Sequence, residues 1–93
     1  MDIKHIESKA RGAFVIKKDH KRVAELTYKQ EDGRINIDHT EVDKSLRGQG
    51  VGEDLVKAAV EFARENGLKV TARCPYASKV LAESDEYSDV YVS

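Results

Sequence analysis

The chain changes its hydrophobic period at one glycine-rich turn, and this change limits the folds that it can adopt. Residues 34–42 (RINIDHTEV) alternate as a strand does, whereas residues 52–66 place their apolar side chains at helical spacing. Residues 68–74 (LKVTARC) alternate again. A strand, a helix and a second strand in this order form a right-handed crossover, so we expect at least one parallel pair of strands.

The segments on either side of this unit complete the expected sheet. Residues 12–19 and 22–29 are rich in β-forming side chains and predict a hairpin, and residues 3–8 are a weaker candidate strand. Pro75 suits the first position of a second helix, and residues 87–93 predict a closing strand. We therefore expect an α+β fold with a mixed sheet: antiparallel N-terminal strands, then β-α-β-α-β with two helices, as one small domain spanning residues 1–93.

The composition argues against several classes of protein. The net charge is −1 and 35% of the residues are charged, so the overall charge favours neither a nucleic-acid nor a membrane partner. No apolar run approaches the ~20 residues that a membrane-spanning helix needs. The single cysteine, Cys74, cannot form an internal disulfide and fits a reducing compartment. We expect a cytoplasmic protein that is a monomer or a weak homodimer.

The turn RGQGVG, residues 47–52, has the features of an anion-binding loop. Glycines before a helix let the backbone amides approach an anion, and Arg47 adds a bidentate phosphate donor. The Walker pattern fails because no Lys-Ser/Thr pair follows, and the Rossmann pattern fails because Gly48, Gly50 and Gly52 are evenly spaced. A simple tight turn remains the alternative to a phosphate cradle.

These residues resemble the acyl-CoA signature of the GCN5-related N-acetyltransferases, [R/Q]-x-x-G-x-[G/A], which is met by Arg47, Gly50 and Gly52. The resemblance covers roughly residues 13–92 and is closest to the very small single-domain members of that superfamily. NIDHTEV, CPYASKVL and YSDVYV, which lie outside the glycine turn, also resemble that group.

The resemblance implies acetyl-CoA as donor substrate and an unknown amine or protein amino group as acceptor. The backbone near Glu41 and Val42 would pair with the pantetheine, and a splay between the strands at 34–42 and 68–74 would admit the thioester. No metal is implied, and no His/Cys/Asp cluster has ligand spacing. The residues that would hold the coenzyme are Val42, Arg47, Gly48, Gln49, Gly50, Val51 and Gly52.

Three departures from the family pattern bear on activity. Lys44 stands where the family commonly has proline, and Leu81 stands at the position of the tyrosine often used as general acid. The two helices that build the acceptor pocket of larger members have no counterpart between the early strands. A non-catalytic acyl-CoA-binding or regulatory module is therefore an alternative to an acetyltransferase, and an interaction domain without a coenzyme site is a third hypothesis.

Four residues are candidates for the chemistry. His39, expected on the inner face of its strand, could act as base, and Glu41 on the same face could act through water. Cys74 precedes a helix N-terminus, which can lower a thiol pKa, so it could accept the acyl group. Tyr76 could replace the missing acid. Each has a structural alternative: packing for His39 and Cys74, and a solvated surface for Glu41.

Overall fold

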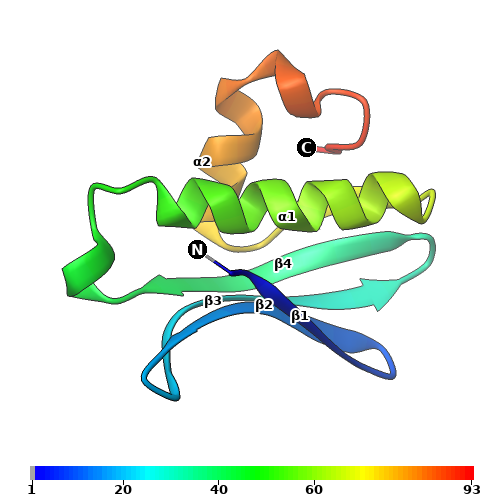
Figure 1. Ribbon diagram of the computed structural model, residues 1–93. Coiled ribbons are helices and arrows are strands. Elements are labelled where there is room, and N and C mark those ends of the chain that lie inside the picture. Colours follow the sequence, from blue (N-terminus) through cyan, green and yellow to red (C-terminus); the bar gives the residue numbers. More distant parts are fainter. Residues whose placement is uncertain (1) are drawn as a thin grey trace.

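A computed structural model describes residues 2–93 and shows a five-stranded sheet crossed on one face by a long helix (Figure 1). The strands lie in the order β1-β2-β3-β4-β5; all neighbouring pairs are antiparallel except β4 and β5, which are parallel. The expected parallel pair and the leading strand are both confirmed. The strand bounds are β1 Lys4–Ser8, β2 Arg11–Lys18, β3 Lys21–Glu31, β4 Arg34–Val42 and β5 Lys69–Ala72.

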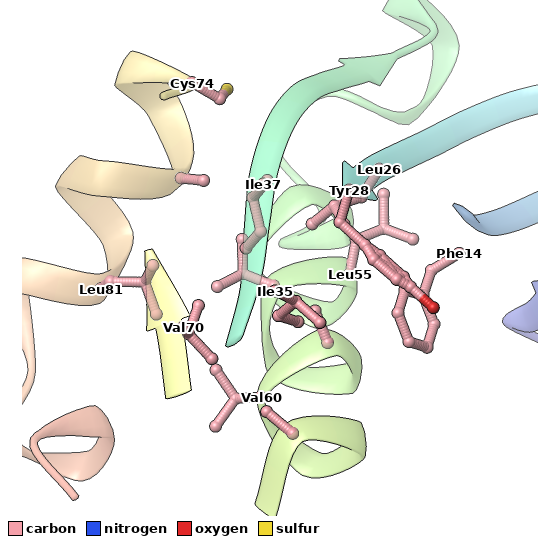
Figure 2. Close-up of a cluster of buried hydrophobic side chains, with 14 of the residues drawn as sticks. Phe14, Leu26, Tyr28, Ile35, Ile37, Leu55, Val60, Val70, Cys74 and Leu81 are labelled. Carbon is pink, nitrogen blue, oxygen red and sulfur yellow. The ribbon is translucent and has the colours of Figure 1, made fainter. Parts of the chain in front are cut away.

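Helix α1 (Val51–Glu65) packs its apolar stripe on the inner face of this sheet, while α2 (Pro75–Glu83) packs beside β5 and α1. Figure 2 shows side chains of α1 and β4 meeting in this core, with Val70 and Leu81 closing it toward α2. Pro75 begins α2, as the sequence predicts. No helix among residues 2–93 is long and apolar enough to cross a membrane.

A bulge in β4 corrects one expectation. Thr27 pairs with His39 and Tyr28 with Ile37, so Asp38 has no partner in β3 and the alternation of β4 reverses there. The Asp38 carboxylate accepts hydrogen bonds from Thr27 and Arg11 on the outer face. Because of this reversal, the placement of His39 on the inner face is wrong.

The closing strand expected at residues 87–93 is also wrong. A 3-10 turn, η2 (Asp85–Tyr87), occupies its start, and only Tyr91 forms an isolated parallel bridge to Val70. Arg64 of α1 holds this segment by a two-fold hydrogen bond to the Asp89 carboxylate, with both N–O distances at 2.9 Å. Tyr87, the last residue of this turn, is buried in the core.

An aromatic cluster fills the space between the sheet and the second half of α1. The His5 ring stacks on Phe14 at 4.2 Å and meets Phe62 edge-on at 4.5 Å. Its Nε2 is hydrogen-bonded to the Tyr28 hydroxyl at 2.6 Å. His5 carries no signal in the sequence because of its place near the terminus, yet the fold uses it as a packing residue.

Candidate functional site

Strands β4 and β5 diverge partway along their length. Their pairing ends at Ile37 and Ala72, where the amides of Arg73 and Cys74 both donate to the Ile37 carbonyl oxygen, at 2.8 and 3.2 Å. Strand β4 continues to Val42 without β5 beside it. The expected splay is therefore present, and it leaves the β5-facing edge of β4 free to pair with an extended ligand.

A cleft of about 530 Å³ lies between the free part of β4 and the start of α1. Its floor comes from inward-facing residues of β4, one wall comes from the glycine-rich turn, and Tyr76 at the start of α2 closes another side. Glu53 is the carboxylate at its rim. The lining residues are Thr40, Val42, Leu46, Arg47, Gly48, Gly50, Val51, Gly52, Glu53 and Tyr76.

The backbone of the turn exposes amide groups to this cleft. Gly48 and Gly50 have φ values of +82° and +72°, a left-handed conformation that L side chains rarely adopt. Asp54 is the first residue of α1 whose amide bonds back along the helix, to the Gly50 carbonyl oxygen at 3.0 Å. The amides of Val51 and Gly52 precede it and are left for a ligand, at the positive end of the helix.

A side chain at position 52 would close part of the cleft. A Cβ built on Gly52 would lie 2.5 Å from the Tyr76 hydroxyl oxygen and 2.8 Å from the ring carbon that bears it. A larger residue at position 52 would therefore displace the Tyr76 ring from its place against α1. The three glycines have different tasks: two shape the turn, and the third makes room for Tyr76.

Cys74 lies at the inner end of the splay, 8% exposed, directly before α2. Figure 2 shows its side chain pointing from the start of α2 toward β4. Its Sγ is 3.5 Å from the Oγ1 of Thr40, which lines the cleft. Burial acts to raise the pKa of this thiol, but its hydrogen bonds with the Thr40 hydroxyl and with the backbone of Tyr76, Ala77 and Thr40 together outweigh burial and lower the pKa. This thiol therefore loses its proton more readily than an ordinary cysteine does.

The structure brings together most of the predicted coenzyme-binding residues and separates two of the predicted catalytic ones. Val42, Gly48, Gly50 and the neighbouring turn residues line the cleft, whereas the Gln49 side chain points away and donates to the Ser45 carbonyl oxygen. His39 and Glu41 lie on the outer face, 3.3 Å apart, and do not line the cleft.

Sequence reasoning missed Thr40, Leu46 and Glu53 as cleft residues. Alternation alone assigned Thr40 to the face opposite Ile37, and only the bulge at Asp38 turns it inward. Glu53 could have been found from its position in the first turn of the helix that the glycines open. Among residues 2–93, no cluster of three His, Cys, Asp or Glu side chains could hold a metal ion.

Several known proteins resemble this chain in sequence. The chain is 39% identical over 50 residues to the protein NATD1 of Homo sapiens, and 38% identical to NATD1 of Xenopus tropicalis. The aligned stretch covers 54% of this chain and 44% or 46%, respectively, of these relatives, so it spans just under half of their length.

Solved structures extend the likeness to the whole fold and to its family. A GCN5-like putative N-acetyltransferase from Staphylococcus aureus is 42% identical with a TM-score of 0.76, covering 99% of this chain and 88% of the other. A putative streptothricin acetyltransferase from Bacillus anthracis, solved with acetyl coenzyme A, shares the fold at 20% identity and a TM-score of 0.60, covering 73% of this chain and 40% of the other. The family described as GCN5-related N-acetyl-transferase matches residues 13–90. The protein belongs to the GCN5-related N-acetyltransferase family.

Proposed function

We propose that this protein binds acetyl-CoA in the cleft between β4 and α1 and transfers the acetyl group to an amine. The observation that carries the proposal is the divergence of β4 from β5 directly beside unpaired amides at the α1 N-terminus. A free strand edge suits the amide-bearing pantetheine arm, and a helix N-terminus suits a pyrophosphate. The two features are adjacent, as the two halves of one coenzyme require.

The donor fits the residues that line the cleft. The amides of Val51 and Gly52 are unpaired, Gly48 and Gly50 hold the left-handed backbone in front of them, and Arg47 supplies the cation. Thr40 and Val42 face the cleft from β4, next to the free backbone edge. The pyrophosphate would therefore lie at the turn, with the thioester farther along β4 toward the splay.

We propose Cys74 as the acceptor of the acetyl group in a first step. Its thiolate sulfur would attack the thioester carbonyl carbon, a new carbon–sulfur bond would form to Cys74, and the bond to the coenzyme sulfur would break. The departing coenzyme thiolate takes up the proton that Cys74 released. The acetyl group then passes to the amine nitrogen, which loses a proton, and the thiol of Cys74 is restored. Thr40, 3.5 Å from the sulfur, supports this role.

The acceptor side of the cleft has few candidate groups. Residues 9–10 form only a turn between β1 and β2. The two helices that build the acceptor pocket of larger family members therefore have no counterpart here. Because His39 and Glu41 lie on the outer face, we do not retain them as bases for the amine. The acceptor amine, of a small molecule or a protein, would enter from the open side or with a surface supplied by a partner chain.

An intact-mass measurement tests this function. The protein is incubated with acetyl-CoA, with and without a panel of amines, beside a Cys74→Ala variant as matched control. We expect an added acetyl group on the wild-type protein only, and its loss when an accepted amine is present. An acetyl group that persists on Cys74→Ala would exclude Cys74 as the carrier.

A non-catalytic acyl-CoA-binding module is the second candidate, and one observation favours it. Leu81, at the position where the family often uses a tyrosine acid, is 1% exposed and part of the core. A backbone-amide NMR titration with acetyl-CoA separates the possibilities. Shifts at residues 47–52 without acetylation or turnover would support the binding module, and no shift there would contradict both candidates.

A further inference from the structure

We infer that Tyr76 is a donor-binding residue that hydrogen-bonds the pyrophosphate of the coenzyme, and that it does not serve as the acid for the departing thiolate. The inference rests on the proposed acetyl-CoA site and assigns a task to a residue that the sequence marks only as a candidate acid.

The Tyr76 hydroxyl lies at the N-terminus of α1. A Cβ on Gly52 would be 2.5 Å from that oxygen, so the hydroxyl lies over the first turn of the helix whose amides are unpaired. The ring also lines the cleft with Gly48 and Gly50. The hydroxyl therefore faces the same volume as the amides that suit a phosphate group.

In the proposed complex, the thioester would lie near residues other than Tyr76. Cys74 is bonded to Thr40 at the point where β4 and β5 diverge, and neither residue is part of the Gly52 contact. Tyr76 is 42% exposed although its ring packs against Gly52. A ligand that covers the hydroxyl would explain why this ring is held at the mouth and not in the core.

The charges around the hydroxyl agree with a hydrogen-bond donor. Burial and the nearby Glu53 and Glu83 carboxylates raise the pKa of Tyr76, so the phenol keeps its proton at neutral pH. A raised pKa makes the group a weaker acid and leaves it a good donor to an anionic oxygen. The position of the hydroxyl, next to the first turn of α1, favours a hydrogen bond to the phosphate over proton donation to the thiolate.

Binding measurements with two donors test the assignment. Acetyl-CoA carries the pyrophosphate and S-acetylpantetheine lacks it, so the lost hydrogen bond should affect only the first. For Tyr76→Phe, which keeps the ring over Gly52, we expect the Kd for acetyl-CoA to rise roughly 5- to 10-fold, the Kd for S-acetylpantetheine to stay unchanged, and kcat/KM for acetyl-CoA to fall by the same factor as the affinity. Tyr91→Phe is the matched control, because its hydroxyl bonds Ser78 outside the cleft.

The other outcomes are equally informative. An unchanged Kd for acetyl-CoA, or an equal loss for both donors, overturns the inference, as does a variant that binds normally but loses kcat. Failure of the wild-type protein to bind acetyl-CoA overturns the proposed function itself, and the inference with it. Amide shifts at residues 47–52 of the wild-type protein distinguish these two kinds of failure.

Discussion

Two tyrosines in this protein lie over glycines, and the two contacts have opposite surroundings. The Tyr28 ring packs over Gly12 of the neighbouring strand, is 1% exposed, and has its hydroxyl bonded to His5. The Tyr76 ring packs over Gly52, is 42% exposed, and faces the cleft. The same close approach of a ring to a glycine therefore occurs in the core in one place and at the cleft in the other.

The difference teaches how to interpret a glycine under an aromatic ring. Where the ring is enclosed on all sides, an added methyl group has no escape, and the cost appears as lost stability. Where the ring borders solvent, it can move outward, and the added methyl group changes the shape of the cleft more than it changes stability.

Gly12→Ala should destabilise the fold most. Its Cβ would overlap the Tyr28 ring, which cannot move because it is enclosed by Phe14, Phe62 and His5. We expect a loss of about 2–4 kcal/mol in the free energy of unfolding, from overpacking and a displaced hydrogen bond. Urea unfolding measures it, and a loss below about 0.5 kcal/mol would remove the contrast between the two contacts.

Gly52→Ala should affect binding more than stability. Alanine favours a helix over glycine by up to about 1 kcal/mol, which offsets the displacement of an exposed ring, so unfolding should change by less than about 1 kcal/mol. The moved ring and added methyl group should raise the Kd for acetyl-CoA about tenfold or more. A large loss of stability with unchanged binding would show that Gly52, like Gly12, serves the packing of the fold and not the cleft.

Acid should weaken the enclosed contact through His5. Burial lowers the pKa of His5, and Glu7, 3.7 Å from Nδ1, opposes this only in part. The unfolded chain therefore binds a proton more readily, so the contribution of neutral His5 is present above pH 6.5 and is lost as the pH falls below it. Urea midpoints at several pH values should show this slope.

Two variants assign the slope to this residue. His5→Phe keeps an aromatic ring against Phe14 and should flatten the pH dependence in that range. His20→Asn changes an exposed turn residue with a φ of +67°, which asparagine tolerates, and should leave the slope in place. A slope that survives in His5→Phe would attribute the effect to other groups.

Glu53→Gln should strengthen donor binding slightly. This carboxylate lines the cleft beside Tyr76 and would repel a pyrophosphate. We expect the Kd for acetyl-CoA to fall about two- to fivefold at low salt and less at physiological salt, because the group is exposed and screened. Glu65→Gln, at the other end of α1, is the control and should have no effect.

Much of the architecture followed from local patterns. Three predictions are confirmed: the alternation of residues 34–37, the helical spacing after Gly52, and the helix start at Pro75. Each depends on residues close together in the chain. The α1 amides were also predictable, since glycines and a helix start are adjacent in the sequence. These features need no knowledge of the neighbouring strands.

The side chains at the site were less predictable. Strict alternation placed His39 on the inner face and Thr40 on the outer face, and the bulge exchanges them. The Asp38 carboxylate at the bulge is hydrogen-bonded to Arg11 and Thr27 of two other strands, and no local pattern contains these contacts. The C-terminal strand failed for a similar reason, because Arg64 holds Asp89 from a distant helix.

The sequence by itself determined the order of elements as far as α2, the parallel crossover and the glycine turn before a helix, since backbone preferences and hydrophobic periods are properties of short segments. Only the tertiary structure decided that Thr40 meets Cys74, that His39 faces away from the cleft, and that Tyr76 covers Gly52. Each of these depends on contacts between segments far apart in the chain, where one bulge or one distant ion pair changes which side chains meet.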